Sequence, residues 1–397
     1  MKIKKVISTI LLCAVLAGCS NSGQSHEIPL EQSNCPVSTM RTGTERQGIK
    51  SMGNGFECTQ NGSYFMYDGF GGGSWLLYID HGSDTVIKLC GRPDCNHTDS
   101  DCNAYFMDAT SICYYDGFLY TFNENPLKVT DKDLIRMNLD GTERAVVYNI
   151  AEFAKANEYD SIVDAKIFNG IIFFMLGKLN ENGITTFDGG YYKLDGSMNE
   201  PKIDTFFTPF LFADGENIVG NVGYDAENEL FINGIWEPEK GAVAELFKAD
   251  NMSGYGYIGT KAHYYVEDGI IIEDSYTEGK KELINIGKKG NYQLACFPDC
   301  IVAYEYLSNE DHVQGVTLDD VTLRFYDWNY NDLGSVKIDY EFDQAMMGFI
   351  CGETPDRIFL TDDFFCLPRY YINKSDFGTG NIEIHALNVP DFGEEED

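Results

Sequence analysis

The chain has 397 residues, with 29 Lys and Arg against 63 Asp and Glu, so its formal net charge at pH 7 is −34. A surface this acidic repels the phosphates of nucleic acids, which argues against a nucleic-acid partner. Hydrophobic residues make up 43% and aromatic residues 14% of the chain, well above the composition of a disordered protein. We therefore expect a folded protein.

The first residues have the pattern of an export signal. Three lysines within the first five residues precede an apolar run over 6–16 that is too short to span a bilayer and ends in small residues. The segment Leu16-Ala17-Gly18-Cys19 resembles the lipobox of bacterial lipoproteins, whose cysteine is acylated after cleavage. The resemblance implies a signal peptide over 1–18, palmitate-type lipidation of Cys19 and a position on the outer face of the cell membrane. The alternative is an ordinary signal peptide cut nearby, with Cys19 incidental.

The remaining chain is predicted to have three parts. Residues 20–33 are polar and without periodicity, so 19–55 is expected to be the lipidated cysteine followed by a flexible tether. Residues 56–392 are rich in aromatic residues and glycine, which is typical of strands joined by tight turns. The last residues, 393–397, form an acidic tail.

A unit of short strands recurs along 56–392, and its clearest copy is residues 111–150. Asp116-Gly117 separates two apolar runs, a strong hairpin signal because glycine supplies the positive φ of such turns. Apolar and polar residues alternate over 134–139, which is the period of a strand with one buried face. A second Asp-Gly pair, Asp140-Gly141, follows. Ala151 to Asn157 is the one segment predicted as a short helix.

Seven copies of this unit can be recognised. Four-stranded units of this length predict an all-β chain folded as a β-propeller of about seven blades, with six to eight as the range. A pair of β-sandwiches is the alternative. The copies contain 64–69, 75–80 and 85–90; 111–150; 165–170, 171–176 and 191–196; 230–234 and 244–250; 263–269, 270–274 and 282–287; 302–306, 323–327 and 335–338; and 357–361, 364–368 and 382–387.

The strand and turn over 134–141 resemble the repeat of TolB-like propeller lipoproteins, which are abundant in Gram-positive anaerobes. The resemblance extends loosely over 56–390 and is strongest at 90–106, a stretch similar to the cysteine-rich segment of propeller lipoproteins from those bacteria. It implies a fold and a location, and no activity.

One group of cysteines is dense enough to suggest chemistry. Cys90, Cys95, His97 and Cys102 place three sulfurs and an imidazole within 13 residues, and three Cys with one His form an accepted zinc set. A zinc ion there is expected to be structural, because four protein ligands leave no position for a substrate water. A disulfide such as Cys90–Cys95 or Cys95–Cys102 is equally compatible with the spacing, and free thiols are the third possibility. No other cofactor is predicted.

The second Pro-Asp-Cys of the chain, at 298–300, resembles the one at 93–95 but lacks the following His and third Cys. Both are predicted to follow the last strand of a blade. Aromatic residues in or near predicted loops, such as Trp236 and Trp328, suggest a surface that binds sugars or peptides, although packing between blades explains them as well.

No zinc-protease, phosphate-loop or nucleophile-elbow motif occurs in the sequence, so no catalytic residue is predicted. The favoured hypothesis is a non-catalytic module that binds a protein, peptide or glycan at the membrane surface. One alternative is an enzyme acting on extracellular polysaccharide or peptide with carboxylates in the propeller channel. The other is a scaffold or sensor subunit of a membrane complex.

Overall fold

The computed structural model describes residues 50–51, 55–69, 73–92, 94–97, 101–107, 109, 111–124, 132–168, 170–179, 185–204, 211–214, 217–225, 227–249, 256–287, 292–305, 321–342, 349–363 and 367–392. They belong to a compact unit of residues 35–397. The expected signal peptide 1–18, the lipidation site Cys19, most of the tether 19–55 and the acidic tail 393–397 lie outside the described residues. No helix in the described part of the chain is long and apolar enough to cross a membrane.

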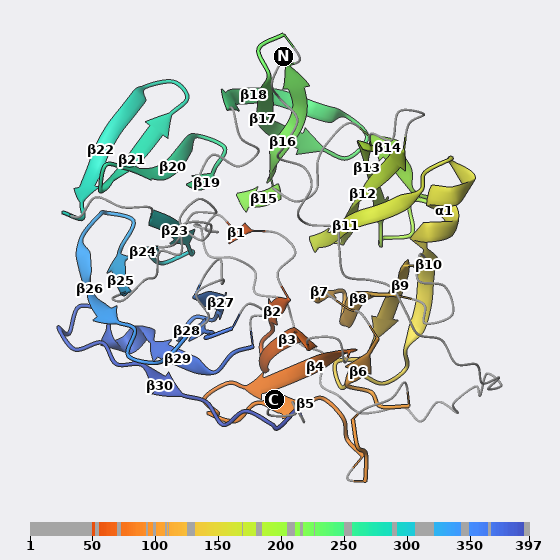
Figure 1. Cartoon of the computed structure of the whole chain (residues 1–397), viewed down its shortest axis with the longest axis horizontal. Coiled ribbons are helices and arrows are strands. Elements are labelled where there is room, and N and C mark those ends of the chain that lie inside the picture. Colours follow the sequence, from red (N-terminus) through yellow and green to blue (C-terminus); the bar gives the residue numbers. More distant parts are fainter. Residues whose placement is uncertain are drawn as a thin grey trace. The chain divides into compact units, whose positions relative to one another are not determined.

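Seven small antiparallel sheets form a seven-bladed β-propeller, which confirms the predicted fold class and blade number (Figure 1). Each blade contains a set of four strands that are consecutive in the chain, ordered from the innermost strand outward, and two of the seven sheets have one further strand. Short turns between neighbouring strands make each blade a local unit of the sequence, as expected for a repeat fold.

The described strands of eight or nine residues all lie in blades 1, 3 and 4. Blade 1 consists of β2 (Phe56–Cys58), β3 (Gly62–Gly69), β4 (Gly73–Asp80), β5 (Ile87–Lys88) and the extra β6 (Tyr105–Phe106); blade 2 of β7 (Cys113–Tyr115), β8 (Phe118–Glu124), β9 (Lys132–Met137) and β10 (Ala145–Asn149); blade 3 of β11 (Ser161–Phe168), β12 (Ile171–Leu179), β13 (Thr185–Lys193) and β14 (Lys202–Asp204); and blade 4 of β15 (Leu211–Asp214), β16 (Asn217–Asp225), β17 (Leu230–Glu237) and β18 (Gly241–Ala249).

The last three blades continue the same order. Blade 5 consists of β19 (Gly256–Ile258), β20 (Ala262–Glu267), β21 (Ile270–Ser275) and β22 (Gly279–Asn285); blade 6 of β23 (Tyr292–Cys296), β24 (Ile301–Glu305), β25 (Thr322–Tyr326) and β26 (Asp332–Lys337); and blade 7 of β27 (Ile350–Glu353), β28 (Arg357–Leu360), β29 (Tyr370–Asn373) and β30 (His385–Ala386).

Two further elements lie outside the set of four strands in each blade. β1 (Lys50–Ser51) lies within the range 19–55, which is expected to be a tether, and it pairs with β15. The helix α1 (Ile150–Ala156) lies one residue before its predicted position. Its N-cap is Asn149, whose side chain accepts a hydrogen bond from the backbone N–H of Glu152, and this satisfies a donor that the first turn leaves free.

The Asp-Gly hairpins have the backbone that the sequence predicts. Asp116 and Gly117 have φ values of 46° and 86° between β7 and β8, and Asp268 and Gly269 have values of 53° and 79° between β20 and β21. Two consecutive positive φ values are characteristic of the type I′ turn, whose twist matches that of paired strands. These turns therefore fix the register of the hairpins that they join.

The hydrophobic core is divided among the contacts between neighbouring blades. Leu119 of blade 2 packs in one cluster with Leu76 of blade 1, and Phe359 of blade 7 packs in another with Phe65 and Leu77 of blade 1; each of these five side chains is at most 2% exposed. Complete burial of such a side chain stabilises the fold by roughly 1.5–3 kcal/mol. Stacking of each blade on the next thus stabilises sheets too small to be stable alone.

The strand predicted over 364–368 of blade 7 lies mostly outside the described residues, which resume at Leu367. Leu367 is fully buried in the core without being part of a strand, and the next strand, β29, begins at Tyr370. Leu367 therefore contributes to packing between the blades instead of to strand pairing.

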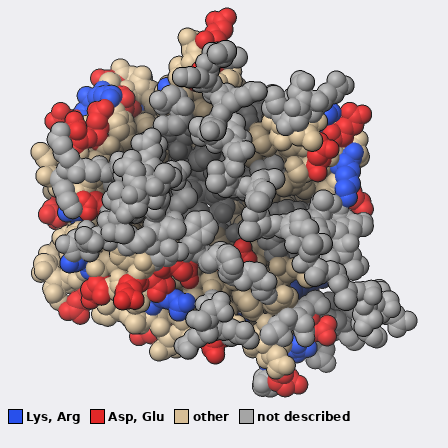
Figure 2. Space-filling view, viewed as in Figure 1, with Lys and Arg blue, Asp and Glu red and all other residues tan. Residues whose placement is uncertain are grey.

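Acidic side chains are more prominent than basic ones among the described residues on the face seen in Figure 2, in keeping with the strongly negative charge of the chain. Several of the basic side chains take part in ion pairs, among them Lys193 with Glu239 and Lys248 with Asp225. Exposed pairs of this kind contribute about 0–1 kcal/mol each.

Candidate metal centre

The four residues predicted as metal ligands, Cys90, Cys95, His97 and Cys102, lie in the loop that joins β5 to β6 in blade 1. Both of these two-residue strands pair with β4. The outer strand of blade 1 is thus divided in two, and the loop between its halves carries all four side chains.

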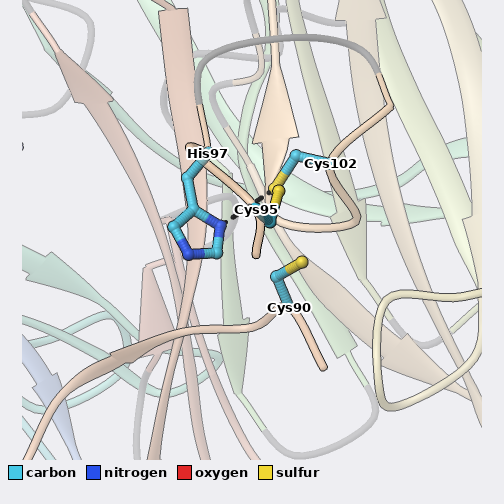
Figure 3. Close-up of side chains that lie close together, drawn as sticks. All are labelled: Cys90, Cys95, His97 and Cys102. Atoms are coloured by element: carbon cyan, nitrogen blue, oxygen red, sulfur yellow. Dashed lines mark hydrogen bonds between the residues drawn. The ribbon is translucent and has the colours of Figure 1, made fainter. Parts of the chain in front are cut away.

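The structure brings these four side chains together. One ligand atom from each residue lies within 4.8 Å of every other, and His97 Nδ1 lies 3.2 Å from Cys102 Sγ (Figure 3). In a tetrahedral site, Zn–S bonds of about 2.3 Å and Zn–N bonds of about 2.0–2.1 Å place the ligand atoms about 3.5–3.8 Å apart. Small shifts of the side chains would therefore suffice to surround one ion.

Hydrogen bonds to sulfur are a second feature of the loop. The Arg92 guanidinium donates to Cys95 Sγ at 3.1 Å, and the backbone N–H of Ala104 donates to Cys102 Sγ at 3.3 Å. Burial by itself raises the pKa of the Cys95 thiol, but hydrogen bonds from Arg92 and the His97 backbone outweigh it and the net pKa is lowered. Donors aimed at sulfur stabilise thiolate, which is the form that binds a metal ion.

Cys102 lies deeper in the site than the other ligands. It is 1% exposed, and burial raises the pKa of its thiol to about 12. An ion bound to this sulfur would displace its proton, because a coordinating thiol is deprotonated outright. Metal binding at this buried sulfur therefore includes the free-energy cost of releasing its proton.

His97 is held in an uncommon backbone conformation. Its φ is 58°, in the left-handed region, and its carbonyl oxygen accepts a hydrogen bond from Trp75 Nε1 at 2.8 Å. Burial, followed by the nearby charges of Lys88 and Arg92, lowers the pKa of the imidazole. A neutral imidazole is the form that binds a metal, so both its orientation and its charge suit a ligand.

Blade 2 clamps the far end of the loop. The Arg144 guanidinium donates to the carbonyl oxygens of Asn103 and Tyr105, the latter at 2.8 Å, and its central carbon lies 3.8 Å from the centroid of the Phe106 ring. Arg144 also lies close enough to Cys102 for a favourable charge interaction. Three thiolates with one Zn²⁺ carry a net charge of −1, which would offset this partly buried cation. The sequence prediction missed Arg144 because 42 positions separate it from Cys102.

No disulfide joins any two of the eight cysteines among the described residues. Three of them are the candidate ligands, and neither of the two disulfides considered for the loop is present in the structure. The others are Cys58, Cys113, Cys296, Cys300 and Cys351.

The second Pro-Asp-Cys segment lies at a different place in its blade. The prediction that it follows a last strand is wrong, because Cys296 ends β23, the innermost strand of blade 6. Cys296 and Cys300 are 2% and 0% exposed, and burial raises the pKa of both thiols. These two cysteines are therefore part of the core between the blades.

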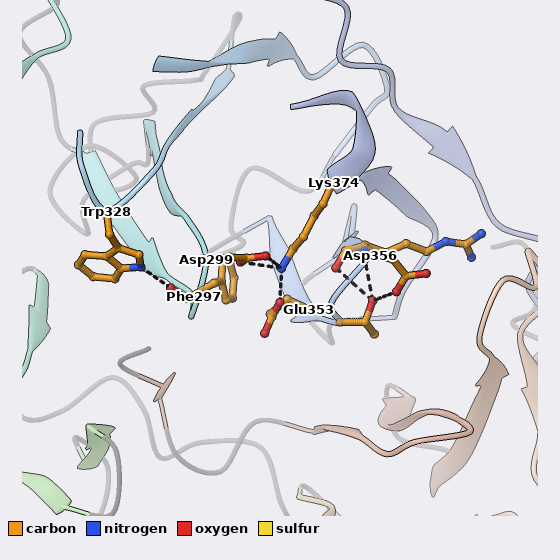
Figure 4. Close-up of polar contacts among 8 residues, drawn as sticks. Phe297, Asp299, Trp328, Glu353, Asp356 and Lys374 are labelled. Carbon is orange, nitrogen blue, oxygen red and sulfur yellow. Dashed lines mark hydrogen bonds and ion pairs between the residues drawn. The ribbon is translucent and has the colours of Figure 1, made fainter. Parts of the chain in front are cut away.

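Two carboxylates meet at the junction of blades 6 and 7. Asp299 and Glu353 both bind Lys374 Nζ, the Asp299 contact being 2.8 Å (Figure 4). The Lys374 side chain is only 6% exposed. Burial lowers its pKa, but the two carboxylates outweigh this effect and the net pKa is raised. The carboxylates thus neutralise a buried cation and join two blades.

The aromatic residues proposed for a binding surface differ in exposure. Trp236 is the next-to-last residue of β17, just before a turn, but its side chain is only 1% exposed and donates from Nε1 to Asp204 at 3.2 Å. Trp328 is half-buried and donates to the carbonyl oxygen of Phe297 at 2.8 Å (Figure 4). Both indole N–H groups are thus used in hydrogen bonds within the propeller.

The sequence matches no protein family and no curated protein. Among solved structures, the chain is similar to a puromycin-hydrolysing peptidase of Mycobacterium tuberculosis, with a TM-score of 0.40 and 10% identity over 86% of this chain and 54% of the peptidase. It is also similar to CoXyl43, a GH43 β-xylosidase/α-arabinofuranosidase from a compost microbial metagenome, with a TM-score of 0.24 and 14% identity over 71% of this chain and 90% of that one. The chain thus spans about half the length of the peptidase. At these TM-scores neither similarity carries an argument about activity.

Proposed function

We propose that the chain is a lipid-anchored β-propeller on the outer face of the cell membrane, that blade 1 holds one structural zinc ion, and that the propeller is a non-catalytic module that binds a protein, peptide or glycan. The convergence of Cys90, Cys95, His97 and Cys102 within 4.8 Å carries the zinc assignment. The lipobox-like segment ending at Cys19 supports the anchor.

A structural role for the ion follows from the number of ligands. Four protein atoms fill a tetrahedral shell, so no position is left for a water that could attack a substrate. The loop also lies on the outer edge of blade 1, where an ion would join β5 to β6 across the divided strand. The expected consequence of zinc is therefore stability of the blade.

Metal analysis of the full-length chain, purified in detergent without chelator, tests the zinc assignment. One zinc per chain is expected in the wild type and in Cys58→Ser, a matched control in the same blade, and less than one-tenth of that in Cys95→Ser. Absence of zinc from the wild type together with loss of two free thiols in the 90–102 loop would instead establish a disulfide.

The anchor and the binding role need separate measurements. Cys19→Ala is expected to abolish incorporation of labelled palmitate and to release the protein from membranes. A glycan and peptide panel is expected to reveal binding without turnover. Hydrolysis of any member of the panel, abolished by a point substitution, would establish the enzyme alternative, and recovery of a fixed set of membrane proteins after crosslinking would establish the scaffold alternative.

A further inference from the structure

The C-terminal segment, residues 387–392, continues beyond β30 of blade 7 and lies on blade 1. The backbone N–H of Val86 donates to the carbonyl oxygen of Asn388 at 2.9 Å, and the backbone N–H of Asn388 donates to the carbonyl oxygen of Asp84 at 2.7 Å. A parallel bridge joins Thr85 to Asn388. This segment therefore connects the last blade to the residues immediately before β5, and it contributes to closure of the ring.

Phe392 anchors the end of this segment. Its ring centroid lies 4.7 Å from that of Tyr67 and 5.3 Å from that of Trp75. Lys88 Nζ lies 4.5 Å from the Phe392 centroid and donates to the carbonyl oxygen of Asp391 at 2.8 Å.

Trp75 of blade 1 also contacts the metal loop. The Trp75 indole that contacts Phe392 donates its N–H to the His97 carbonyl oxygen, and its ring packs edge-on against Tyr105 at 5.9 Å. Lys88 lies two residues before Cys90, at the start of the loop. Trp75 thus has the metal loop on one side and the C-terminal segment on another.

We infer that the metal centre and the C-terminal segment form one closure device, in which binding of a zinc ion to the loop and docking of residues 387–392 on blade 1 stabilise each other. The inference rests on the proposed zinc site. An ion bound to His97 fixes the carbonyl oxygen that orients the Trp75 indole, and the indole in turn forms part of the seat of Phe392. Loss of the ion frees His97, so the indole loses a fixed acceptor and the seat loosens.

Coupling between two binding events is reciprocal. If zinc favours docking of the C-terminal segment, removal of the docked side chain must weaken zinc binding by the same factor. Couplings between two binding sites are typically about 5- to 150-fold. The effect is therefore measurable from either side.

The test compares Phe392→Ala with Phe187→Ala in the full-length chain in detergent. Phe187 is 40% exposed in blade 3 and provides a matched loss of one aromatic ring. Zinc affinity is measured by competition with a chromogenic chelator. Hydrogen exchange of residues 84–88 and 387–392 is measured with zinc and after its removal.

Phe392→Ala is expected to lower zinc affinity about five-fold or more, with Phe187→Ala at the wild-type value. Zinc removal is expected to speed exchange in 84–88 and 387–392 more than in blades 3 and 4. Unchanged zinc affinity in Phe392→Ala, with the same exchange of 387–392 in both metal states, would overturn the coupling and leave the zinc site intact. A wild type without zinc would overturn both proposals at once.

Discussion

The decisive perturbation of the metal centre is Cys102→Ser, which removes the most buried sulfur of the four ligands. An ion that binds only the folded chain stabilises it by RT ln(1 + [Zn]/Kd), which is about 4.1 kcal/mol when free zinc is a thousand times Kd. Serine is a poor ligand for zinc beside two thiolates, so the variant should lose this contribution. In chelator, where the wild type loses it as well, the two proteins should differ by only about 1 kcal/mol.

The assay is urea unfolding of wild type, Cys102→Ser and Cys58→Ser, each at fixed free zinc and in chelator. Cys58 is a half-buried thiol of β2 in the same blade, and its sulfur lies 3.6 Å from the carbonyl oxygen of Thr59. Its variant should retain the full zinc-dependent increase in midpoint. The reasoning fails if Cys102→Ser is stabilised by zinc as strongly as the wild type, or if zinc leaves the wild-type midpoint unchanged.

Three further predictions concern the surroundings of the site and the blade junctions. Gly141→Ala should cost at least about 1 kcal/mol more than Gly196→Ala in urea unfolding and should weaken zinc binding. Both glycines lie in the turn before the outermost strand of a blade with φ of 78° and 75°, but only at Gly141 would a Cβ lie 2.9 Å from a carbonyl oxygen of the metal loop. Lys374→Met should destabilise the propeller by about 2 kcal/mol, because it leaves the Asp299 and Glu353 carboxylates without their shared cation. The control Lys240→Met, at an exposed ion pair, should change the unfolding free energy by less than about 0.5 kcal/mol, and equal effects of the two substitutions would contradict a stabilising role of the junction. Burial raises the pKa of the Asp363 carboxyl in the folded protein. The stabilisation that comes from this shift is therefore complete below the carboxyl pKa of the unfolded chain, about 3.9, and is lost as pH rises through the higher pKa of the folded protein. Asp363→Asn should therefore be more stable than the wild type at pH 7 and lose that advantage near pH 3 in thermal unfolding, and a constant difference across this range would refute the assignment.

The sequence was sufficient for the features that depend on neighbouring residues. The Asp116-Gly117 turn follows from the conformational freedom of two adjacent residues. The blade number follows from the seven copies of the repeated strand unit, which match the seven sheets. The short innermost strands, such as β2 and β27, have too few residues to show a period and were not among the predicted strands. In the same way, the spacing of Cys90, Cys95 and Cys102 was enough to suggest a ligand set.

The parts of the site that the sequence did not predict depend on tertiary contacts. Trp75 holds the His97 carbonyl from 22 positions away, and Arg144 holds the Asn103 carbonyl from 41 positions away. Neither side chain belongs to a local motif, because their roles arise from the pairing of β4 with β6 and from the packing of blade 2 on blade 1. A cation or an indole in a strand has no pattern that reveals which loop it will meet.

The metal loop belongs to blade 1, the blade on which the C-terminal segment of blade 7 docks to close the ring. The outermost strands of the two blades that meet there are short: β5 and β6 have two residues each in blade 1, and β30 has two in blade 7, whereas β18 and β22 have nine and seven. Fewer ladder hydrogen bonds hold such strands in place, so they open at a lower free energy than the longer ones. An ion that joins the two halves of a divided strand closes a loop whose freedom would otherwise oppose folding. The C-terminal segment docks beside the residues just before β5, so an ion in the metal loop would stabilise both the divided outer strand of blade 1 and the docked segment. The same ion in blade 4 or 5 would reinforce a sheet whose outer strand is already long.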